Sequence, residues 1–260
     1  MTTVTETRRV TLETGAVTVV ERWGDAGPTV LCVHGIGSSR RDFARLGEAL
    51  AATHRVVAYD QRGHGDSATS APLDLQTLAG DLRAVADSVG TVAAVVGHSW
   101  GGAVALCGGP RVARSLVLVD PLIRVQKNTF AADYVDDLVD VLAHPPGAER
   151  DAAIRAMFAE TNAADREAKV HAMGQLALAT VARIGSDNAV DAGGWDLRER
   201  LAALKVPATI LLAGEDSIVS ADDVANLAPG VRVQTIAGHG HTLHRSAFEL
   251  FADAVREAAL

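Results

Sequence analysis

The sequence predicts an α/β fold, a doubly wound and mostly parallel sheet with an inserted helical cap. Apolar runs of strand length alternate with helical patterns from the segment TVLCVH onward, which is typical of a parallel sheet. Residues 122–195 then carry helical spacing alone, and strand character returns after them. We therefore expect a core formed by residues 1–121 and 196–260, and a cap or lid at 122–195.

Composition limits the classes of partner. The 260 residues are 48% hydrophobic and 22% charged, enough to bury a large core around one sheet. The net charge of -8 opposes binding to nucleic acid or anionic membranes, which carry the same sign, so we expect a small-molecule substrate instead. No apolar run resembles a signal peptide or approaches the roughly 20 residues that span a bilayer, which predicts a cytoplasmic protein. The oligomeric state is left open.

The individual elements follow in order. RRVTLE and AVTVVER, separated by Thr14 and Gly15, predict an antiparallel hairpin that opens the sheet. The continuous apolar run TVLCVH predicts a strand buried on both faces. Further strands are expected at RVVAYD, TVAAVVG, SLVLVD, ATILLAG and VRVQTI, and cap helices at FAADYVDDLVDVL, ERDAAIRAMFAE and REAKVHAMGQLALATVARI. Cys32 and Cys107 lie in apolar segments, so we expect free structural thiols.

Residues 97–101 form the pattern G-x-S-x-G between an apolar strand and a helix-compatible run. Ser99 on such a sharp turn is a candidate nucleophile, and Gly97 and Gly101 leave room for the crossing segments. The helix that begins there would direct its N–H groups at a developing negative charge, with the Trp100 N–H as first oxyanion donor. The alternative is a purely structural glycine turn, because the bare pattern also occurs by chance.

Together with HGIG at 34–37 and DQRGHGDS at 60–67, GHSWGG at 97–102 resembles the motifs of the α/β-hydrolase superfamily. The resemblance covers nearly the whole chain. It implies that the backbone N–H of Ile36 is the second oxyanion donor. It also implies that the loop containing His64 is structural.

The same resemblance implies the order nucleophile, acid, histidine along the chain. Residues 238–241 match the family pattern G-x-G-H, which predicts His241 as the base, with His239 and His244 in supporting or surface positions. The spacing H-x-H-x-x-H could alternatively bind zinc, but a dinuclear hydrolase would need an aspartate where Leu243 stands. We therefore predict no metal and no cofactor.

Asp216 is the predicted acid, because it follows the strand before the one that leads to the histidine. The match is imperfect. Alignment on Gly214 places Ser217 in the acid position, whereas alignment on SIVS restores Asp216. Glu215 and Asp120 stay open as alternatives, since some members of the family take the acid from the earlier strand.

These residues predict acyl transfer to water through an acyl-enzyme. Serine in place of the aspartate of related dehalogenases and epoxide hydrolases argues against alkyl-halide or epoxide opening. The substrate would be a small to medium, largely apolar ester, lactone or thioester. C–C bond hydrolase, perhydrolase, acyltransferase, lyase and non-enzymatic receptor remain alternatives on the same fold. Apolar cap residues that could line the pocket or pack the cap are Phe130, Tyr134, Met157, Phe158, Met173, Leu176 and Trp195.

Overall fold

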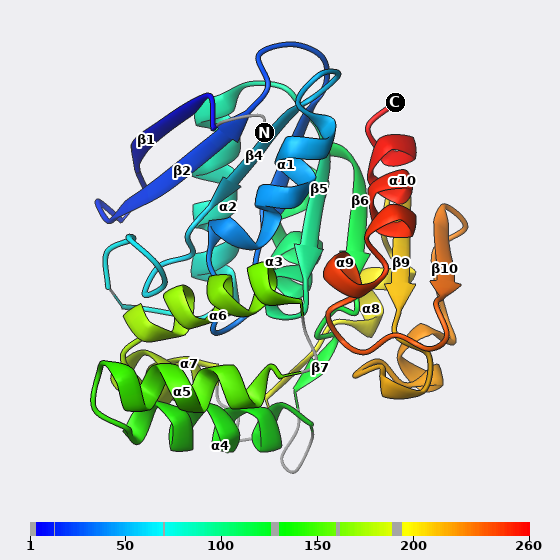
Figure 1. Ribbon diagram of the computed structural model, residues 1–260. Helices are drawn as coiled ribbons and strands as arrows, with labels where there is room; N and C mark the ends of the chain where they lie inside the picture. The colour runs from blue at the N-terminus through cyan, green and yellow to red at the C-terminus, as the bar shows by residue number, and fades with distance from the viewer. Residues whose placement is uncertain (1–3, 13, 70, 126–129, 160–161, 189–193) are drawn as a thin grey trace.

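The computed structural model describes residues 4–12, 14–69, 71–125, 130–159, 162–188 and 194–260. Its centre is an eight-stranded sheet in the order β1-β2-β4-β3-β5-β6-β9-β10, which is parallel from β4 to β10 and antiparallel at β1 and β2 (Figure 1). The predicted α/β fold with a mostly parallel sheet and an opening hairpin is confirmed. The strands are β1 (Glu6–Thr11), β2 (Val17–Trp23), β3 (Thr29–Val33), β4 (Arg55–Tyr59), β5 (Val92–His98), β6 (Ala113–Val119), β9 (Ala208–Leu212) and β10 (Val231–Thr235).

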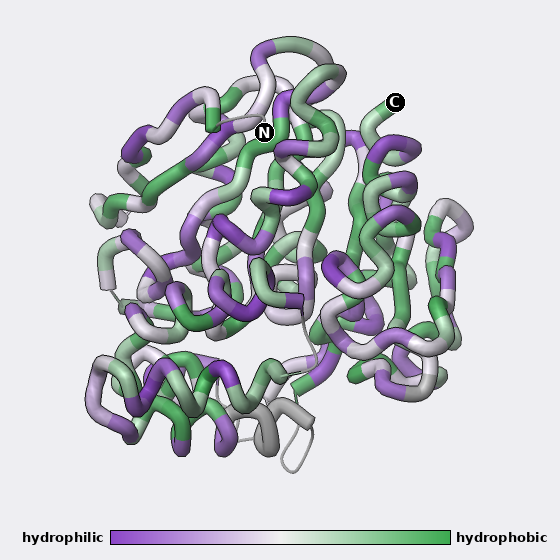
Figure 2. Tube along the Cα trace, in the orientation of Figure 1, coloured by the Kyte–Doolittle hydropathy of each residue, from purple (hydrophilic) through white to green (hydrophobic). Residues whose placement is uncertain are grey.

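Successive side chains of the inner strands point to opposite faces of the sheet, and both faces are covered. All five residues of β3 are buried: Leu31 and Val33 pack on one face, and Val30 and Cys32 on the other. This explains why the apolar run is continuous instead of alternating. Figure 2 shows the same hydrophobic character along β6 and β9, in contrast to the hydrophilic edge strand β1.

Two layers of helices complete the core. On one face lie α2 (Leu75–Val89), α3 (Trp100–Gly108) and α8 (Arg198–Ala202), and on the other lie α1 (Ala44–Leu50) and α10 (Phe248–Ala258). Shorter helical segments connect these layers to the strands: η1 (Arg40–Phe43), η2 (Gly109–Arg111), η4 (Gly214–Asp216), η5 (Ala221–Val224) and α9 (Leu243–Ser246). Helix α2 begins at Asp74, whose side chain accepts hydrogen bonds from the N–H groups of Gln76 and Thr77.

Four further helices lie between β6 and β9 in the chain and pack together at the carboxyl ends of the strands (Figure 1). They are α4 (Phe130–Ala143), α5 (Ala148–Met157), α6 (Ala163–Gln175) and α7 (Leu178–Asp187). At the base of this segment, β7 (Arg124–Val125) pairs antiparallel with β8 (Trp195–Asp196). The division into a core and a cap at 122–195 stays a prediction that these helices agree with.

Within the described ranges, no helix combines the length and the apolar character needed to cross a lipid bilayer.

Candidate active site

Ser99 occupies the turn between β5 and α3, with φ of 53° and ψ of −120°. A positive φ is strained for a residue with a side chain, so the surrounding structure must hold it there. The Ser99 N–H donates to the Val119 carbonyl at 3.0 Å, and the Ser99 carbonyl accepts from the N–H groups of Gly102 at 2.8 Å and Leu122 at 3.0 Å. These three bonds fix the backbone of Ser99 to the end of β6 and to α3.

The glycines around Ser99 are required by close backbone approach. A Cβ at Gly97 would lie 2.3 Å from the Gly101 carbonyl oxygen, and one at Gly101 would lie 2.2 Å from the carbonyl oxygen of Val33. Both distances are too short for real atoms, and the obstructing atoms are backbone. The G-x-S-x-G pattern therefore fits the tight packing of this turn against β3.

The predicted oxyanion donors lie on two segments that converge at Ser99. Trp100 is the first residue of α3, so its N–H has no acceptor within the helix. The loop after β3 approaches from the other side, because a Cβ built on Gly35 would lie 3.2 Å from the Ser99 Cβ. The next residue, Ile36, is partly buried and packs against both the core and the helices α4 to α7.

His241 lies on the loop between β10 and α9, and its ring contacts a carboxylate. Its Nδ1 is 2.6 Å from Oδ2 of Asp120, at the end of β6, and its side chain is 23% exposed. The prediction that Asp216 orients this imidazole does not match the geometry. Asp216 is exposed in η4, whereas Asp120 is fully buried beside the ring. Asp120, the alternative on the earlier strand, is thus the carboxylate that contacts the His241 ring.

Three hydrogen-bond donors other than His241 contact the Asp120 carboxylate. Its Oδ1 accepts from the Ser217 hydroxyl at 2.5 Å and from the Ala213 N–H at 3.3 Å, and its Oδ2 accepts from the Ile218 N–H at 3.2 Å. Its φ of 40° is also strained. Ser217, which one alignment places in the acid position, instead donates to Asp120.

The rings of His98 and His244 form a stack with the ring of His241. The His98 ring is centred 4.7 Å from that of His241 and 4.3 Å from that of His244, and His98 Nε2 lies 3.1 Å from the His241 carbonyl oxygen. With Nε2 protonated, His98 donates to this carbonyl and ties the loop of His241 to the nucleophile turn. Burial lowers the pKa of His98 well below its usual value, so the ring stays neutral.

The far end of this stack contains an ion pair that the sequence did not reveal. Asp42 in η1 lies 3.2 Å from His244 Nε2 and also bonds the Arg245 guanidinium. Burial alone would raise the pKa of Asp42, but the charge of Arg245 holds it well below its usual value. Asp42, His98 and His244 place possible ligand atoms within 4.8 Å of one another. Because Arg245 and the buried Lys169 already supply positive charge there, these residues fit an ion pair better than a bound cation.

Two further neutral histidines hold the loop that contains Ile36. His34 Nε2 accepts from the Gln61 N–H at 3.0 Å, and His64 Nε2 accepts from the Gly37 N–H at 3.3 Å. Burial lowers the pKa of His34 to about 4 and that of His64 to about 3. The expected structural role of His64 fits these contacts, since protonation would remove the acceptor.

We expect the free energy of unfolding to fall as the pH is lowered from about 6.5 to about 4. Unfolded histidine takes up a proton near 6.5, whereas folded His34 does so near 4 and His64 near 3. The unfolded state thus binds more protons in this window, and each histidine contributes a slope of about 1.4 kcal/mol per pH unit. Urea denaturation at a series of pH values should find a shallower slope for His34→Gln. The exposed control His144→Gln should leave it unchanged, and an unaltered slope for His34→Gln would contradict the assignment.

The candidate pocket residues separate into groups. Met173 and Leu176 are fully buried in the apolar core of the helices α4 to α7. Met157 and Phe158 pack against this core. Trp195 instead packs on the sheet side, where its ring centre lies 5.9 Å from that of Trp100. The side chains of Phe130 and Tyr134 lie outside the described residues.

Comparison with known proteins agrees with this architecture. The sequence model of the alpha/beta hydrolase family matches residues 30–254. The chain belongs to the α/β-hydrolase family. Among family relatives, a pimeloyl-[acyl-carrier protein] methyl ester esterase of Neisseria meningitidis is 32% identical over 205 residues, which are 75% of this chain and 77% of that protein.

Other matches differ in length or identity. Polyketide synthase ThaQ of Burkholderia thailandensis is 28% identical over 254 residues, which are 89% of this chain but only 12% of the synthase. The solved structure of an N-formylmaleamic acid deformylase from Pseudomonas putida S16 superposes with a TM-score of 0.80 at 22% identity, covering 96% of this chain and all of that chain. The latter likeness concerns the fold alone. A lipase and an esterase are among the relatives that this family member resembles.

Proposed function

We propose that this α/β-hydrolase cleaves acyl bonds through Ser99 as nucleophile, His241 as base and Asp120 as the acid. The observation that carries the proposal is the 2.6 Å contact between His241 Nδ1 and the buried Asp120 carboxylate, beside a serine held at positive φ. When Nδ1 of the neutral ring carries the proton and donates a hydrogen bond to Asp120, Nε2 is unprotonated. This tautomer can accept the serine proton at Nε2. Asp120 also stabilises the imidazolium that results.

The reaction proceeds in two stages. The Ser99 Oγ attacks the carbonyl carbon while His241 takes its proton, and the N–H groups of Trp100 and Ile36 stabilise the oxyanion. The tetrahedral intermediate collapses, the bond to the leaving group breaks, and His241 returns the proton to the departing alcohol or thiol. Water then gives a proton to His241 and attacks the acyl group. Collapse of the second intermediate releases the acid and restores Ser99.

The substrate is a small to medium, largely apolar ester, lactone or thioester. Ile36, which is partly buried between the core and the helices α4 to α7, supports an apolar acyl group at this position. The name of one relative, a methyl ester esterase, is compatible with an ester substrate. C–C bond hydrolysis on the same residues is the second candidate, because it needs the same oxyanion stabilisation.

Labelling with a fluorophosphonate tests the proposed nucleophile directly. We expect one equivalent to add to the wild-type protein, on the peptide that contains Ser99, because only an activated serine reacts quickly. Ser99→Ala should not be labelled, whereas Ser220→Ala, at an exposed serine of the same chain, should be labelled like the wild type. Absence of labelling in a folded wild-type protein would instead favour a ligand receptor.

Hydrolysis of p-nitrophenyl esters of increasing acyl length would then define the acyl site. Activity that peaks at one chain length supports the ester assignment and sizes the site. A labelled protein that hydrolyses none of these esters would favour the C–C bond alternative.

A further inference from the structure

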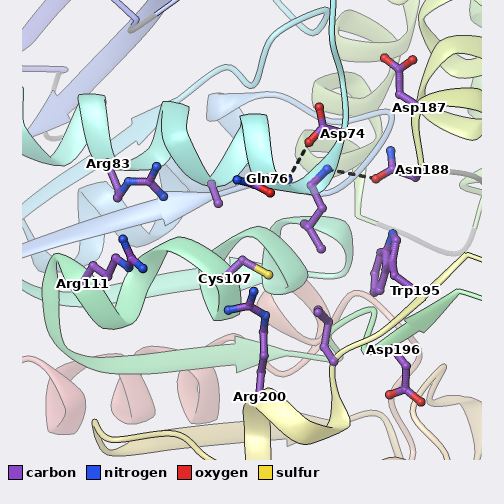
Figure 3. Close-up of a pocket in the computed structure, with 13 residues that line it drawn as sticks. Asp74, Gln76, Arg83, Cys107, Arg111, Asp187, Asn188, Trp195, Asp196 and Arg200 are labelled. Atoms are coloured by element: carbon purple, nitrogen blue, oxygen red, sulfur yellow. Dashed lines mark hydrogen bonds between the residues drawn. The ribbon is translucent and has the colours of Figure 1, made fainter.

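A separate groove of about 570 Å³ lies beside α2, α3 and α8 (Figure 3). None of the five residues proposed for catalysis lines it. Cys107, near the end of α3, lies in the middle of the groove in Figure 3. Trp195, in β8, lies at one end of the groove. The groove is therefore a site distinct from the proposed catalytic centre.

Three arginines from different elements border one end of the groove. Arg83 comes from α2, Arg111 from η2 and Arg200 from α8, and Figure 3 shows them around Cys107. Within the described parts of the chain, no carboxylate pairs with any of them. Arg83 is half-buried, and Arg111 and Arg200 are exposed at the rim of the groove. Three positive charges without counter-charges favour a bound anion.

The carboxylates at the other end of the groove already have partners. Asp74 accepts from the first turn of α2, Asp187 pairs with Arg183 at 2.7 Å, and Asp196 pairs with Arg198 at 2.7 Å. Their charges are offset locally, so they do not neutralise the three arginines. Burial raises the pKa of the Cys107 thiol, so it also contributes no negative charge.

We propose that this groove binds a small organic molecule that carries phosphate groups. The planar guanidinium groups of Arg83, Arg111 and Arg200 would bind the phosphate oxygens in bidentate fashion. Leu75, Leu197 and the ring of Trp195 line the remainder of the groove and supply an apolar surface for the organic part. A volume of about 570 Å³ holds a ligand of this size.

Calorimetric titration with inorganic pyrophosphate tests the charged half of the site. We expect the triple variant Arg83→Gln/Arg111→Gln/Arg200→Gln to bind pyrophosphate at least about tenfold more weakly than the wild type, which is about 1.4 kcal/mol. The control is a triple variant with the same change of charge at exposed positions that have no ion pair among the described residues: Arg9→Gln/Arg114→Gln/Lys205→Gln. It should bind within about twofold of the wild type.

Three outcomes would overturn the proposal. The first is a wild type that binds no pyrophosphate at millimolar concentration. The second is an equal loss of affinity in both triple variants, which would indicate general electrostatic attraction. The third is sulfate that binds as tightly as pyrophosphate at matched ionic strength, which would exclude selectivity for phosphate groups. The titration involves no ester hydrolysis, so its result is independent of the function proposed for Ser99.

Discussion

Asp120→Asn is expected to lower kcat for ester hydrolysis by about 10⁴-fold, whereas Asp216→Asn leaves kcat within about twofold of the wild type. The amide would offer an N–H or a neutral oxygen to His241 Nδ1, so the imidazole would lose both its tautomer and the charge that stabilises its protonated form. Asp216 is exposed in η4, while Asp120 makes the 2.6 Å contact. Steady-state kinetics on one p-nitrophenyl ester would measure both variants.

The KM of Asp120→Asn should change little, because the carboxylate lies behind the imidazole and does not reach the substrate. Circular dichroism would establish that both variants are folded. If Asp216→Asn loses activity and Asp120→Asn keeps it, the contact with Asp120 is structural and the acid assignment fails.

Arg62→Met is expected to lower the free energy of unfolding by about 3–5 kcal/mol, because it removes the guanidinium that offsets the charge of the buried Asp81 carboxylate. The two side chains are 1% and 3% exposed and form two parallel bonds, Nε to Oδ2 at 2.6 Å and Nη2 to Oδ1 at 2.5 Å. They connect the loop after β4 to α2. Urea denaturation of the purified variant would measure the loss.

Two comparisons make this prediction specific. Arg155→Met breaks an exposed pair with Glu167 and should leave the denaturation midpoint unchanged within error. The double variant Arg62→Met/Asp81→Leu should regain part of the stability, since no uncompensated charge remains. A double variant as unstable as the single variant would show that the cost comes from packing and not from the charge of the Asp81 carboxylate.

The sheet was predictable because its apolar runs are long and distinctive. Strands such as β3 are buried on both faces, which requires an unbroken apolar run, and the turn at Ser99 requires glycines at fixed positions. Both the unbroken apolar run and the glycine spacing are requirements on a few consecutive residues. Local patterns of this kind predict local structure well.

The proposed acid could not be chosen between Asp120 and Asp216 from the sequence, for a physical reason. Asp120 follows β6 and Asp216 follows β9, and these strands are neighbours in the sheet, so both carboxylates arise at the same edge. The two residues differ in where their side chains lie: that of Asp120 is buried against His241, whereas Asp216 is exposed. The φ of 40° at Asp120 and the donors from Ser217 and Ile218 set the direction of its side chain, and no short pattern in the sequence encodes them.

The ion pair of Asp42 with Arg245 escaped prediction because its two members are 203 positions apart. The groove of Arg83, Arg111 and Arg200 was missed for the same reason, since its arginines lie on three separate elements. The sequence did predict a supporting or surface position for His244, as it did for His239. The burial of His244 beneath His98 required the folded chain.

The pairing of β7 with β8 makes the segment between them modular. Arg124 and Val125 lie opposite Asp196 and Trp195, so the chain leaves and re-enters the core through one short ladder. Ser99 and Asp120 both precede this ladder and directly follow the adjacent strands β5 and β6, so their spacing does not depend on the helices between β7 and β8. If the proposed function holds, a chimaera that receives the helices of another family member at this junction would take up a new acyl preference while it kept the proposed nucleophile and acid. Natural exchange at the same junction would diversify substrates and leave Ser99 and Asp120 in place.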